Sequence, residues 1–565
     1  MRRVRSFAII AAAFAVALGC GQGPAVLSSP PRSAVASAAS SASPSAIACA
    51  PTEATGQPWW SDRVFYEVLV RSFQDSDGDG IGDLRGLTDR LDDLNDGDPA
   101  TDADLGVTGL WLMPVTEAAS YHGYDVTDYE AIERDYGSID DFRRLVAAAH
   151  DRGIAVIVDL VINHTSRDHP WFRDAQTPGS AHDDWYVWAD ERPGFARSDG
   201  TRVWHASGDR FYYAYFWEGM PDLNLANPQV TAAVDEVGQF WLEEMGADGF
   251  RLDAARHLIE DGRKLENTPA TFEWLSAFRK RLEGVDREAL LLGEVWDATS
   301  MSSRYVRDGS LDMAFDFGLA SATITSLRSG DAGTLRAAQR EVAESYPPGG
   351  VATFLTNHDQ DRIVDQLGRD PAAARLAATL LLTGGGVPFI YYGEEIGMTG
   401  RKPDERIRTP MRWDSTGPGA GFTDGTPWEP LGDDPPGTDV ATERADPGSL
   451  LSHYRDLIAL RSAHPALSRG TWLPARAQPA AINAFLRHAG DETVLVVVNV
   501  SEEAVERPAI TLQEGPLCGP IDPRMLLGGG EVAAPAIGPK GGFEDYVPVD
   551  RLRPREAIVV SLQAP

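Results

Sequence analysis

The stretch Gly249-Phe250-Arg251-Leu252-Asp253-Ala254-Ala255-Arg256-His257 decides the fold, because it reads as a short buried strand that ends in a charged cluster. A second apolar run, Leu290-Leu291-Leu292-Gly293, ends in Glu294, and a third, Val351 to Leu355, leads into Asn357-His358-Asp359. Three carboxylates, each just past a short apolar strand, are typical of a (β/α) barrel, in which catalytic groups lie at the carboxyl ends of different strands. The sequence therefore predicts an α/β barrel with an active site at one end.

Short apolar runs alternate with helical patterns over residues 58–469, as expected of parallel β/α units. Eight strands favour a closed (β/α)8 TIM barrel. Amphipathic stretches predict outer helices at Asp140–Arg152, Val230–Met245 and Thr271–Leu282. The predicted strands are Val64–Phe73, Val107–Pro114, Ala155–Val161, Gly249–Asp253, Leu290–Glu294, Met313–Phe317, Val351–Thr356 and Val387–Tyr392.

The segment at about residues 164–226, after the third predicted strand, is far longer than an ordinary βα loop. It is rich in Trp, Tyr, Phe, His and Asp, so we expect an inserted domain. Most of its aromatic residues should form the core of this insertion, while one or two face a ligand.

Beyond the helix-like stretch Leu450–Ala463, the pattern changes to alternating strands and turns. Thr493–Val500 and Ala557–Leu562 are typical strands of this region. We therefore expect a C-terminal antiparallel β-sandwich domain at residues 470–565.

The N-terminal residues 1–19 are typical of an export signal, with a basic start and an apolar run that is short for a membrane span. Ala17-Leu18-Gly19-Cys20 is similar to a bacterial lipoprotein cleavage box, although Leu is more usual than Ala at the first position. An ordinary cleaved signal with an incidental cysteine is the alternative. Residues 20–57, almost all Ser, Ala, Pro and Gly, predict a flexible tether. We expect an extracellular protein that is anchored to the cell surface through Cys20.

The net charge of −33 argues against nucleic acid as a partner, because phosphate binding needs clustered Lys and Arg. We expect a monomer. If Cys20 is lipidated, Cys49 and Cys518 remain as a pair that could form one disulfide in an oxidising environment. Two unrelated thiols are the alternative.

The spacing of the strand-end acids points to glycoside chemistry. Neighbouring strands lie roughly 4.8 Å apart, so carboxylates at the tips of strands four and five should approach the separation of about 5–5.5 Å of a retaining glycosidase pair. Asp253 could then attack the anomeric carbon, and Glu294 could protonate the leaving oxygen and activate water. Arg251 points to the same face and can keep Asp253 ionised by direct charge pairing. Glu294 needs a raised pKa, which a dry environment and nearby acids can provide.

Five motifs resemble, in order, the signatures of the α-amylase family of glycoside hydrolases. They are Asp159–His164, Met220–Asn224, Gly249–His257, Gly293–Trp296 and Phe354–Asp359. The resemblance covers about Trp59 to the C-terminus and implies that the insertion is the B domain of this family. It also implies roles for seven side chains: Asp253 as nucleophile, Glu294 as general acid/base, Asp359 as transition-state stabiliser, and Tyr124, His164, Arg251 and His358 as contacts of the sugar at the cleavage point.

Details within the motifs discriminate among members of the family. Tyr121-His122-Gly123-Tyr124 lacks the Asp that exo-acting α-glucosidases usually carry two residues before Gly-Tyr, and Ala254 after the nucleophile is similar to α-amylases. By contrast, Met220–Asn224 and Arg408–Asp414 resemble oligo-1,6-glucosidases. The chain thus resembles the group between α-amylases and oligo-1,6-glucosidases.

We expect an α-amylase that cleaves internal α-1,4-glucosidic bonds of starch, maltodextrins and related α-glucans. An exo-acting α-glucosidase, an oligo-1,6-glucosidase or a glucanotransferase is the first alternative, since each would use the same intermediate. A non-catalytic sugar-binding barrel is the second alternative, and the retention of all three acids argues against it.

Carboxylates at alternate positions after the first strand predict a calcium site. Asp75-Ser76-Asp77-Gly78-Asp79-Gly80-Ile81-Gly82-Asp83 has the oxygen donors and the glycine turns of a hard-cation loop, but Gly86 replaces the Glu of a full EF-hand. The stretch resembles a calcium loop that several family members carry, which implies Asp75, Asp77, Asp79, Asp83 and the Ile81 carbonyl as ligands of Ca²⁺. A solvated acidic turn is the alternative. Analogy with α-amylases allows a second calcium ion at Asn163, Asp222 and the His257 carbonyl.

Overall fold

The fold is described from a computed structural model, which covers residues 57–98, 100–101 and 103–564. The predicted signal, the tether, Cys20 and Cys49 lie outside this part of the chain, so the lipid anchor and the Cys49–Cys518 bridge stay predictions. Over the described residues, the structure contains no helix with the length and apolar character needed to cross a membrane.

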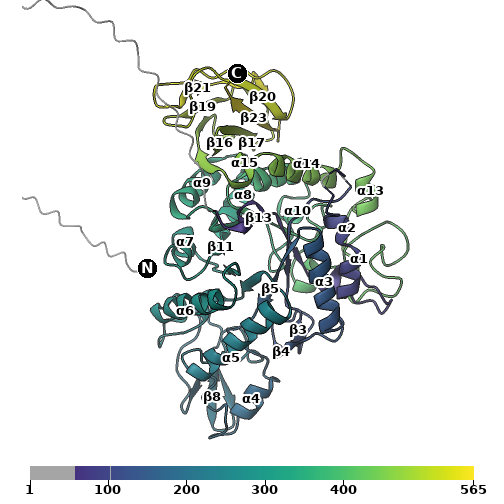
Figure 1. The fold of residues 1–565 in the computed structure, drawn as a ribbon, viewed down its shortest axis with the longest axis vertical. Helices are drawn as coiled ribbons and strands as arrows, with labels where there is room; N and C mark the ends of the chain where they lie inside the picture. The colour runs from purple at the N-terminus through teal and green to yellow at the C-terminus, as the bar shows by residue number, and fades with distance from the viewer. Residues whose placement is uncertain (1–56, 99, 102, 565) are drawn as a thin grey trace, which may run out of the picture. The chain divides into compact units, whose positions relative to one another are not determined.

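Eight parallel strands close into a barrel, which confirms the predicted fold class (Figure 1). Every residue in these strands is buried, as in parallel sheets whose two faces are both covered, and this burial explains why their sequences read as continuous apolar runs. In barrel order the strands are β1 (Phe65–Val68), β2 (Gly109–Leu112), β5 (Ala155–Leu160), β9 (Gly249–Leu252), β10 (Leu290–Gly293), β11 (Met313–Phe315), β12 (Val351–Thr353) and β13 (Val387–Tyr391).

The observed strands are shorter than predicted, most clearly at the first strand. The predicted strand Val64–Phe73 becomes β1 followed by a 3₁₀ turn, η2 (Val70–Ser72). The Ser72 amide donates to the Leu69 carbonyl at 3.0 Å, so the backbone leaves the sheet there and starts the acidic loop. Apolar composition alone does not reveal such a turn, because the turn is buried as well.

The predicted outer helices are present with small shifts at their ends. They are α3 (Ile139–Asp151), α5 (Pro228–Gln239) and α6 (Pro269–Val285). The second prediction, Val230–Met245, spans α5 and a π-helical turn, η3 (Phe240–Glu244), that continues it. Ser138 begins α3 with a capping box, in which its hydroxyl accepts from the Asp141 amide.

The long segment after β5 contains a three-stranded antiparallel sheet. Its strands are β6 (Trp188–Ala189), β8 (Arg210–Tyr213) and β7 (Trp204–Ser207), in that order across the sheet. Aromatic side chains form a separate small core there, with Trp204, Tyr213 and Tyr215 buried. The aromatic richness of this segment therefore reflects largely its own packing.

The C-terminal region is antiparallel β structure, as predicted. A five-stranded sheet in the order β14-β16-β17-β23-β20 and a three-stranded sheet in the order β15-β19-β21 surround one apolar core (yellow-green to yellow in Figure 1). The predicted strands Thr493–Val500 and Ala557–Leu562 are β17 (Glu492–Asn499) and β23 (Ala557–Gln563). The other strands are β14 (Thr471–Pro474), β15 (Arg476–Gln478), β16 (Ile482–Ala489), β19 (Ala509–Leu512), β20 (Asp522–Leu527) and β21 (Phe543–Tyr546).

Two buried arginines bind backbone carbonyls where this region meets the barrel, and Arg487 spans the two parts. Arg487 of β16 donates to the Thr383 carbonyl at 3.2 Å and the Gly470 carbonyl at 3.0 Å. Arg461 of α14 (Leu450–Ala463) donates to the Leu382 carbonyl at 3.0 Å. Within the described chain, neither guanidinium has a carboxylate within 4.0 Å. The carbonyls at the C-terminus of helix α11 (Pro371–Thr383) carry partial negative charge, which compensates the two cations.

We predict that Arg487→Leu lowers the Tm by about 3–6 °C, because each buried carbonyl that loses its donor costs about 1–3 kcal/mol. Differential scanning calorimetry measures this shift. The control is Arg524→Leu in the same domain, where the side chain is 74% exposed and should leave the Tm within about 1 °C of the wild-type value. Equal shifts in the two variants would show that the junction does not depend on these carbonyl contacts.

Candidate active site

Arg251 of β9 lies at the centre of a buried acidic cluster and is 0% exposed. Its Nη1 donates to Asp159 Oδ1 at 2.8 Å and to Asp253 Oδ1 at 2.9 Å. Its Nη2 lies 3.0 Å from Glu294 Oε2, in an ion pair that is not aligned as a hydrogen bond. One guanidinium therefore contacts three carboxylates from three neighbouring strand regions.

The strand register explains this convergence. Asp159 of β5 is the direct partner of Arg251 of β9, so the two side chains project from the same face of the barrel wall. Gly293 of β10 pairs with Leu252 of β9, which places the following residues, Glu294 and Asp253, side by side at the carboxyl ends of adjacent strands. The predicted acid pair is thus brought together by the sheet itself.

Burial raises the pKa of both members of this pair to about 7. Arg251 opposes the rise for each carboxyl, while the charge of Asp359 adds to it. Burial also raises the pKa of Asp159 to about 6. Because one cation faces three carboxylates, the cluster keeps a proton near neutral pH and titrates as a unit. A pair that holds one proton contains both an acid and a base, as general acid/base chemistry requires.

Ala254 turns the chain sharply after Asp253. Its φ of 49° and ψ of 32° lie in the left-handed region, which is uncommon for a residue other than glycine. The turn aims the Ala254 amide at Glu294 Oε2, to which it donates at 3.1 Å. This unfavourable backbone conformation links the two predicted catalytic acids directly, as strained residues at functional sites often do.

Asp359 lies on the loop after β12, and its side chain is 32% exposed. Arg408 Nη2 lies 3.1 Å from Asp359 Oδ1, and His358 Nε2 lies 3.3 Å from Asp359 Oδ2. Burial alone would raise the pKa of Asp359, but the surrounding positive charge, including that of Arg408, lowers it below the usual value. Asp359 is therefore a carboxylate at neutral pH.

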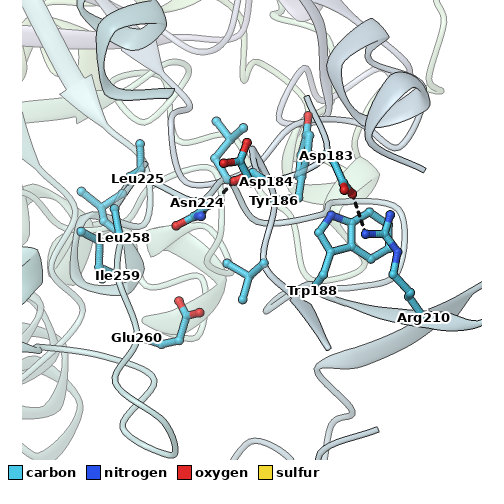
Figure 2. A pocket seen from close by; sticks show the side chains of 13 residues that line it. Asp183, Asp184, Tyr186, Trp188, Arg210, Asn224, Leu225, Leu258, Ile259 and Glu260 are labelled. Atoms are coloured by element: carbon cyan, nitrogen blue, oxygen red, sulfur yellow. Dashed lines mark hydrogen bonds and ion pairs between the residues drawn. The ribbon is translucent and has the colours of Figure 1, made fainter. Parts of the chain in front are cut away.

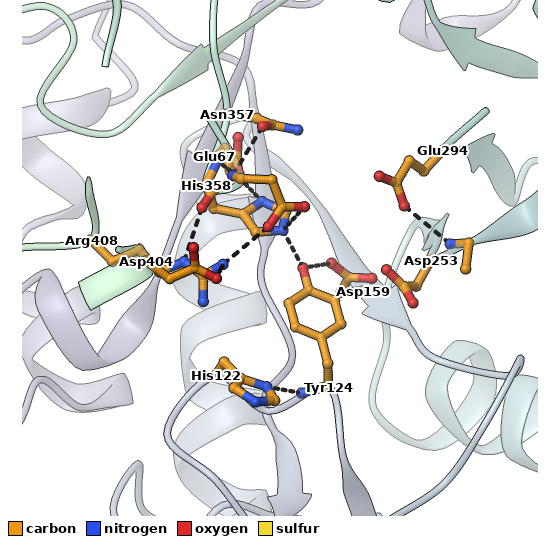
Figure 3. Close-up of polar contacts among 12 residues, drawn as sticks. Glu67, His122, Tyr124, Asp159, Asp253, Glu294, Asn357, His358, Asp404 and Arg408 are labelled. Carbon is orange, nitrogen blue, oxygen red and sulfur yellow. Dashed lines mark hydrogen bonds and ion pairs between the residues drawn. The ribbon is translucent and has the colours of Figure 1, made fainter. Parts of the chain in front are cut away.

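A chain of polar contacts links this loop to the Arg251 cluster (Figure 3). The Tyr124 hydroxyl donates to Asp159 Oδ2 at 2.9 Å and lies 2.7 Å from His358 Nε2. On its other side, His358 Nδ1 lies 2.5 Å from Glu67 Oε1. His164 is connected through the backbone, with its Nε2 3.0 Å from the Tyr124 carbonyl, and burial lowers its pKa to about 4. All seven residues predicted for the site therefore belong to one contiguous network.

Sequence reasoning missed three members of this network: Glu67, Asp159 and Arg408. Glu67 and Asp159 are the single acidic residues of the otherwise apolar strands β1 and β5. A lone acid in a buried strand is costly unless it is paired, which is a signal that could have identified both. Arg408 begins the motif Arg408–Asp414, but nothing in that motif indicates that the Arg408 side chain reaches the loop after β12.

The acidic loop after β1 brings together part of the predicted calcium ligand set. Oxygens of Asp75, Asp77 and Asp83 lie within 4.8 Å of one another, whereas Asp79 is not part of this group. The Asp79 carboxylate instead accepts from the Ile81 amide at 2.8 Å. Asp83 also caps helix α1 (Leu84–Asp89) by accepting from two backbone amides. Three carboxylates with oxygens this close together offer the type of ligand that a hard cation prefers.

The residues predicted for a second calcium ion are partly assembled. Asn163 Nδ2 donates to Asp222 Oδ2 at 3.0 Å, and both residues are buried. Asn163 Oδ1 is buried without a hydrogen-bond partner, which leaves this oxygen available as a metal ligand. His257 is buried too, with its Nδ1 3.1 Å from the Leu265 carbonyl. The second calcium ion stays a prediction.

A separate cavity of about 430 Å³ lies beside the inserted sheet (Figure 2). Its lining includes Trp188, Arg210, Asn224 and Glu260 but none of the three strand-end acids. The Arg210 guanidinium lies 4.1 Å from the centroid of the Trp188 ring, so this ring already has a partner. The Arg251 cluster therefore remains the candidate active site.

Comparisons with known proteins show the family to which the chain is similar. A protein-family model described as "Alpha amylase, catalytic domain" matches residues 67–470 of the chain. Alpha-amylase 3 of Dictyoglomus thermophilum is 39% identical over 458 residues, which are 79% of this chain and 86% of that protein. Oligo-1,6-glucosidase of Parageobacillus thermoglucosidasius is 31% identical over 529 residues, covering 79% of this chain and 91% of that protein. The crystal structure of alpha-amylase from H. orenii is 40% identical with a TM-score of 0.74, covering 89% of this chain and all of that chain.

We predict that Arg251→Met lowers the Tm by roughly 5 °C or more, because it leaves three buried carboxyls without a cation. The loss of stability relative to wild type should grow between about pH 6 and about pH 9. A carboxyl with a raised pKa binds its proton more tightly in the folded state, so stability falls as pH rises until the folded pKa is passed. In wild type this decline ends near the folded values of about 6 to 7 for Asp159, Asp253 and Glu294, but without Arg251 it continues to higher pH.

Thermal unfolding followed by circular dichroism at several pH values measures this dependence. Arg251→Lys is the matched variant, because it retains the charge and should lose less stability. A difference between wild type and Arg251→Met that stays constant over the pH range would contradict the prediction.

Proposed function

The chain belongs to the α-amylase family of glycoside hydrolases, and within this family we propose that it cleaves internal α-1,4-glucosidic bonds of starch, maltodextrins and related α-glucans. The observation that carries the glycosidase chemistry of this proposal is the pair Asp253 and Glu294, which lie at the ends of adjacent strands and contact one guanidinium. Adjacent-strand carboxylates of this kind support a retaining mechanism.

In the proposed reaction, the Asp253 carboxylate attacks the anomeric carbon while the glycosidic C–O bond breaks. Glu294 gives its proton to the leaving oxygen, which departs as an alcohol. Water then gives a proton to Glu294 and attacks the anomeric carbon, which frees Asp253. Asp359, ionised beside Arg408, would stabilise the positive charge that develops on the sugar ring.

Two features support cleavage within a chain rather than at its end. Tyr121 occupies the position where exo-acting α-glucosidases of this family usually carry the Asp that helps to close the pocket. Trp296, two residues beyond Glu294, is 45% exposed and stacks on Phe317 with ring centroids 4.5 Å apart. An exposed, supported aromatic face next to the acid offers a platform for a further sugar ring.

A second candidate function is that of an exo-acting α-glucosidase, an oligo-1,6-glucosidase or a glucanotransferase. The motifs at Met220–Asn224 and Arg408–Asp414 and the similarity to an oligo-1,6-glucosidase favour it. These activities would use the same acid pair as the amylase reaction. They differ from it in the type of bond that enters the site and in the acceptor that takes the glucosyl group.

We predict that wild type releases mixed short oligosaccharides early from maltoheptaose and soluble starch, and that Asp253→Asn lowers this activity by roughly 10⁴-fold or more. The amide cannot act as a carboxylate nucleophile. Chromatography of the products over time measures both results. Glu260→Gln serves as the control, because Glu260 lines the separate cavity of Figure 2 and should leave the activity unchanged.

Other product profiles would redirect the assignment. Glucose as the sole early product would favour the exo-acting alternative, and longer oligosaccharides than the substrate would favour a transferase. If wild type left both substrates intact, the proposal of a hydrolase acting on α-glucans would fail.

We also propose that Asp75, Asp77 and Asp83 bind Ca²⁺ together with backbone oxygens of the same loop. A calcium ion would balance the mutual repulsion of these carboxylates and stiffen the loop. Asp75 already organises the loop, because its carboxylate accepts from the Gly78 amide at 2.8 Å and the Gly80 amide at 2.9 Å. The alternative is a solvated acidic turn that needs no ion.

We predict that millimolar Ca²⁺ raises the Tm of EDTA-treated wild type by several degrees, since a ligand that binds only the folded state stabilises it. Asp77→Asn should reduce this shift, because it removes one of the three carboxylates of the group. The fold should otherwise stay intact, since Asp77 is exposed. Asp151→Asn, an exposed acid at the end of α3, should shift like wild type. A calcium-independent Tm in wild type would favour the solvated turn.

We further propose export and attachment to the cell surface through a lipid on Cys20. This proposal is supported by the basic and apolar start of the chain, the sequence Ala17-Leu18-Gly19-Cys20 and the Ser/Ala/Pro-rich stretch that follows. An α-glucan too large to enter a cell would then meet the enzyme outside. A monomeric state stays a prediction.

A further inference from the structure

We propose that Glu67 is a positioning residue that holds the His358 imidazole with its hydrogen on Nε2, facing Tyr124 and Asp359. The expected effect on kcat rests on the proposed function, whereas the tautomer assigned to His358 does not. Glu67 lies in β1 against Nδ1 of His358, and it has no other role in the mechanism above.

The geometry of Glu67 is that of a built contact. The residue is 2% exposed, and its backbone is fixed between β2 and β13, where it pairs with Trp111 and Tyr391. Its Oε1 lies 2.5 Å from His358 Nδ1 and also accepts from the His358 backbone amide at 3.3 Å. One carboxyl oxygen thus holds both the ring and the backbone of the residue that precedes Asp359.

The hydrogen positions follow from the donors and acceptors along the chain. The single hydroxyl hydrogen of Tyr124 goes to Asp159, which is an acceptor because Arg251 already donates to it. The Tyr124 oxygen must then accept the hydrogen on His358 Nε2, 2.7 Å away. His358 Nε2 also lies 3.3 Å from an Asp359 oxygen, which is a second acceptor. A bare Nε2 would face two electron-rich oxygens, so the hydrogen belongs on this nitrogen.

Glu67 makes that arrangement stable from the other side of the ring. Burial raises the pKa of Glu67 and lowers the pKa of His358, so the pair favours a neutral carboxyl that donates to a bare Nδ1. If the proton moved across to Nδ1 instead, His358 would still carry a hydrogen on Nε2. Either position of the shared proton therefore leaves the imidazole as a donor toward Tyr124 and Asp359.

The consequence reaches the acid pair through three further contacts. Tyr124, when it accepts from His358, is left to donate to Asp159, and Asp159 shares Arg251 with Asp253 and Glu294. Loss of the Glu67 contact would let the imidazole rotate or move its hydrogen to Nδ1. The ring of Tyr124, which stacks on His358 with centroids 5.5 Å apart, would then lose its fixed position. Misplacement of about 1 Å near a reaction centre can cost about 100-fold in rate.

The test compares Glu67→Met with Glu67→Gln. Methionine is of similar length but cannot donate to Nδ1, whereas the glutamine amide can replace the donor of a neutral carboxyl. Nitrogen-15 NMR of histidine-labelled protein reads the tautomer of His358, with the signal assigned through His358→Gln. Steady-state kinetics on maltoheptaose and thermal unfolding accompany it. Glu394→Gln is the matched control, because Glu394 is an equally buried acid whose carboxyl accepts from Tyr454, outside this network.

We expect the Nε2–H tautomer in wild type, Glu67→Gln and Glu394→Gln. In Glu67→Met we expect mixed or reversed protonation and a loss of about 10- to 100-fold in kcat, with a smaller change in KM. Glu67→Gln should rescue kcat to within about threefold of wild type. If Glu67→Met does not fold, Glu67→Asp, whose shorter side chain withdraws the carboxyl from Nδ1, should give the same tautomer change and an intermediate loss.

Two results would overturn the proposal. The first is an Nδ1–H tautomer in wild type, and the second is an equal loss of kcat in the Gln and Met variants, which would indicate a need for charge or packing instead. The tautomer is measured without substrate. An inactive wild type with the expected Nε2–H signal would therefore count against the proposed function and leave the role of Glu67 supported.

Discussion

The site depends on one electrostatic constraint: a single buried guanidinium, Arg251, faces three carboxylates inside the barrel. Unpaired charges in a protein interior cost several kcal/mol each, so every neighbouring polar group has to be placed in relation to this cluster. Asp159 supplies the first counter-charge from the adjacent strand, and Tyr124 then donates to Asp159. Burial, together with the surplus of negative charge, favours a proton on the acid pair near neutral pH.

Rigid and adjustable parts of the network have different origins. Asp159, Arg251 and Glu67 lie within strands, where the register of the barrel fixes them. Asp253 and Glu294 come one residue beyond their strands, and Ala254 in its left-handed conformation ties them together. Asp359 lies further out on a loop and owes its place to contacts with Arg408 and His358. The groups proposed to form and break bonds thus lie at the boundary between the strands of the barrel and the loops that follow them.

Much of this arrangement could be predicted from the sequence, for a physical reason. Strands covered on both faces must be apolar throughout, so their ends are visible as sudden charged residues such as Asp253 and Glu294. Contacts between residues on different strands were harder to predict, because Asp159 meets Arg251 only through a strand register that no local pattern encodes. The contact between Glu67 and His358 was hidden for the same reason, and so was the exclusion of Asp79 from the acidic group after β1. These outcomes depend on tertiary contacts rather than on periodicity or spacing.

The junction between the barrel and the C-terminal sheets differs from the active site in the nature of its acceptors. Arg461 and Arg487 bind backbone carbonyls, which carry no proton over the whole range in which the acid pair titrates. Acidification or a neutral environment can therefore change the ionisation of the catalytic groups without loosening the attachment of the C-terminal domain. A carbonyl is also present whatever side chain a position bears. The hydrogen bonds of this junction therefore depend on the two arginines and on the path of the chain around them, and not on the chemistry of the acceptor side chains.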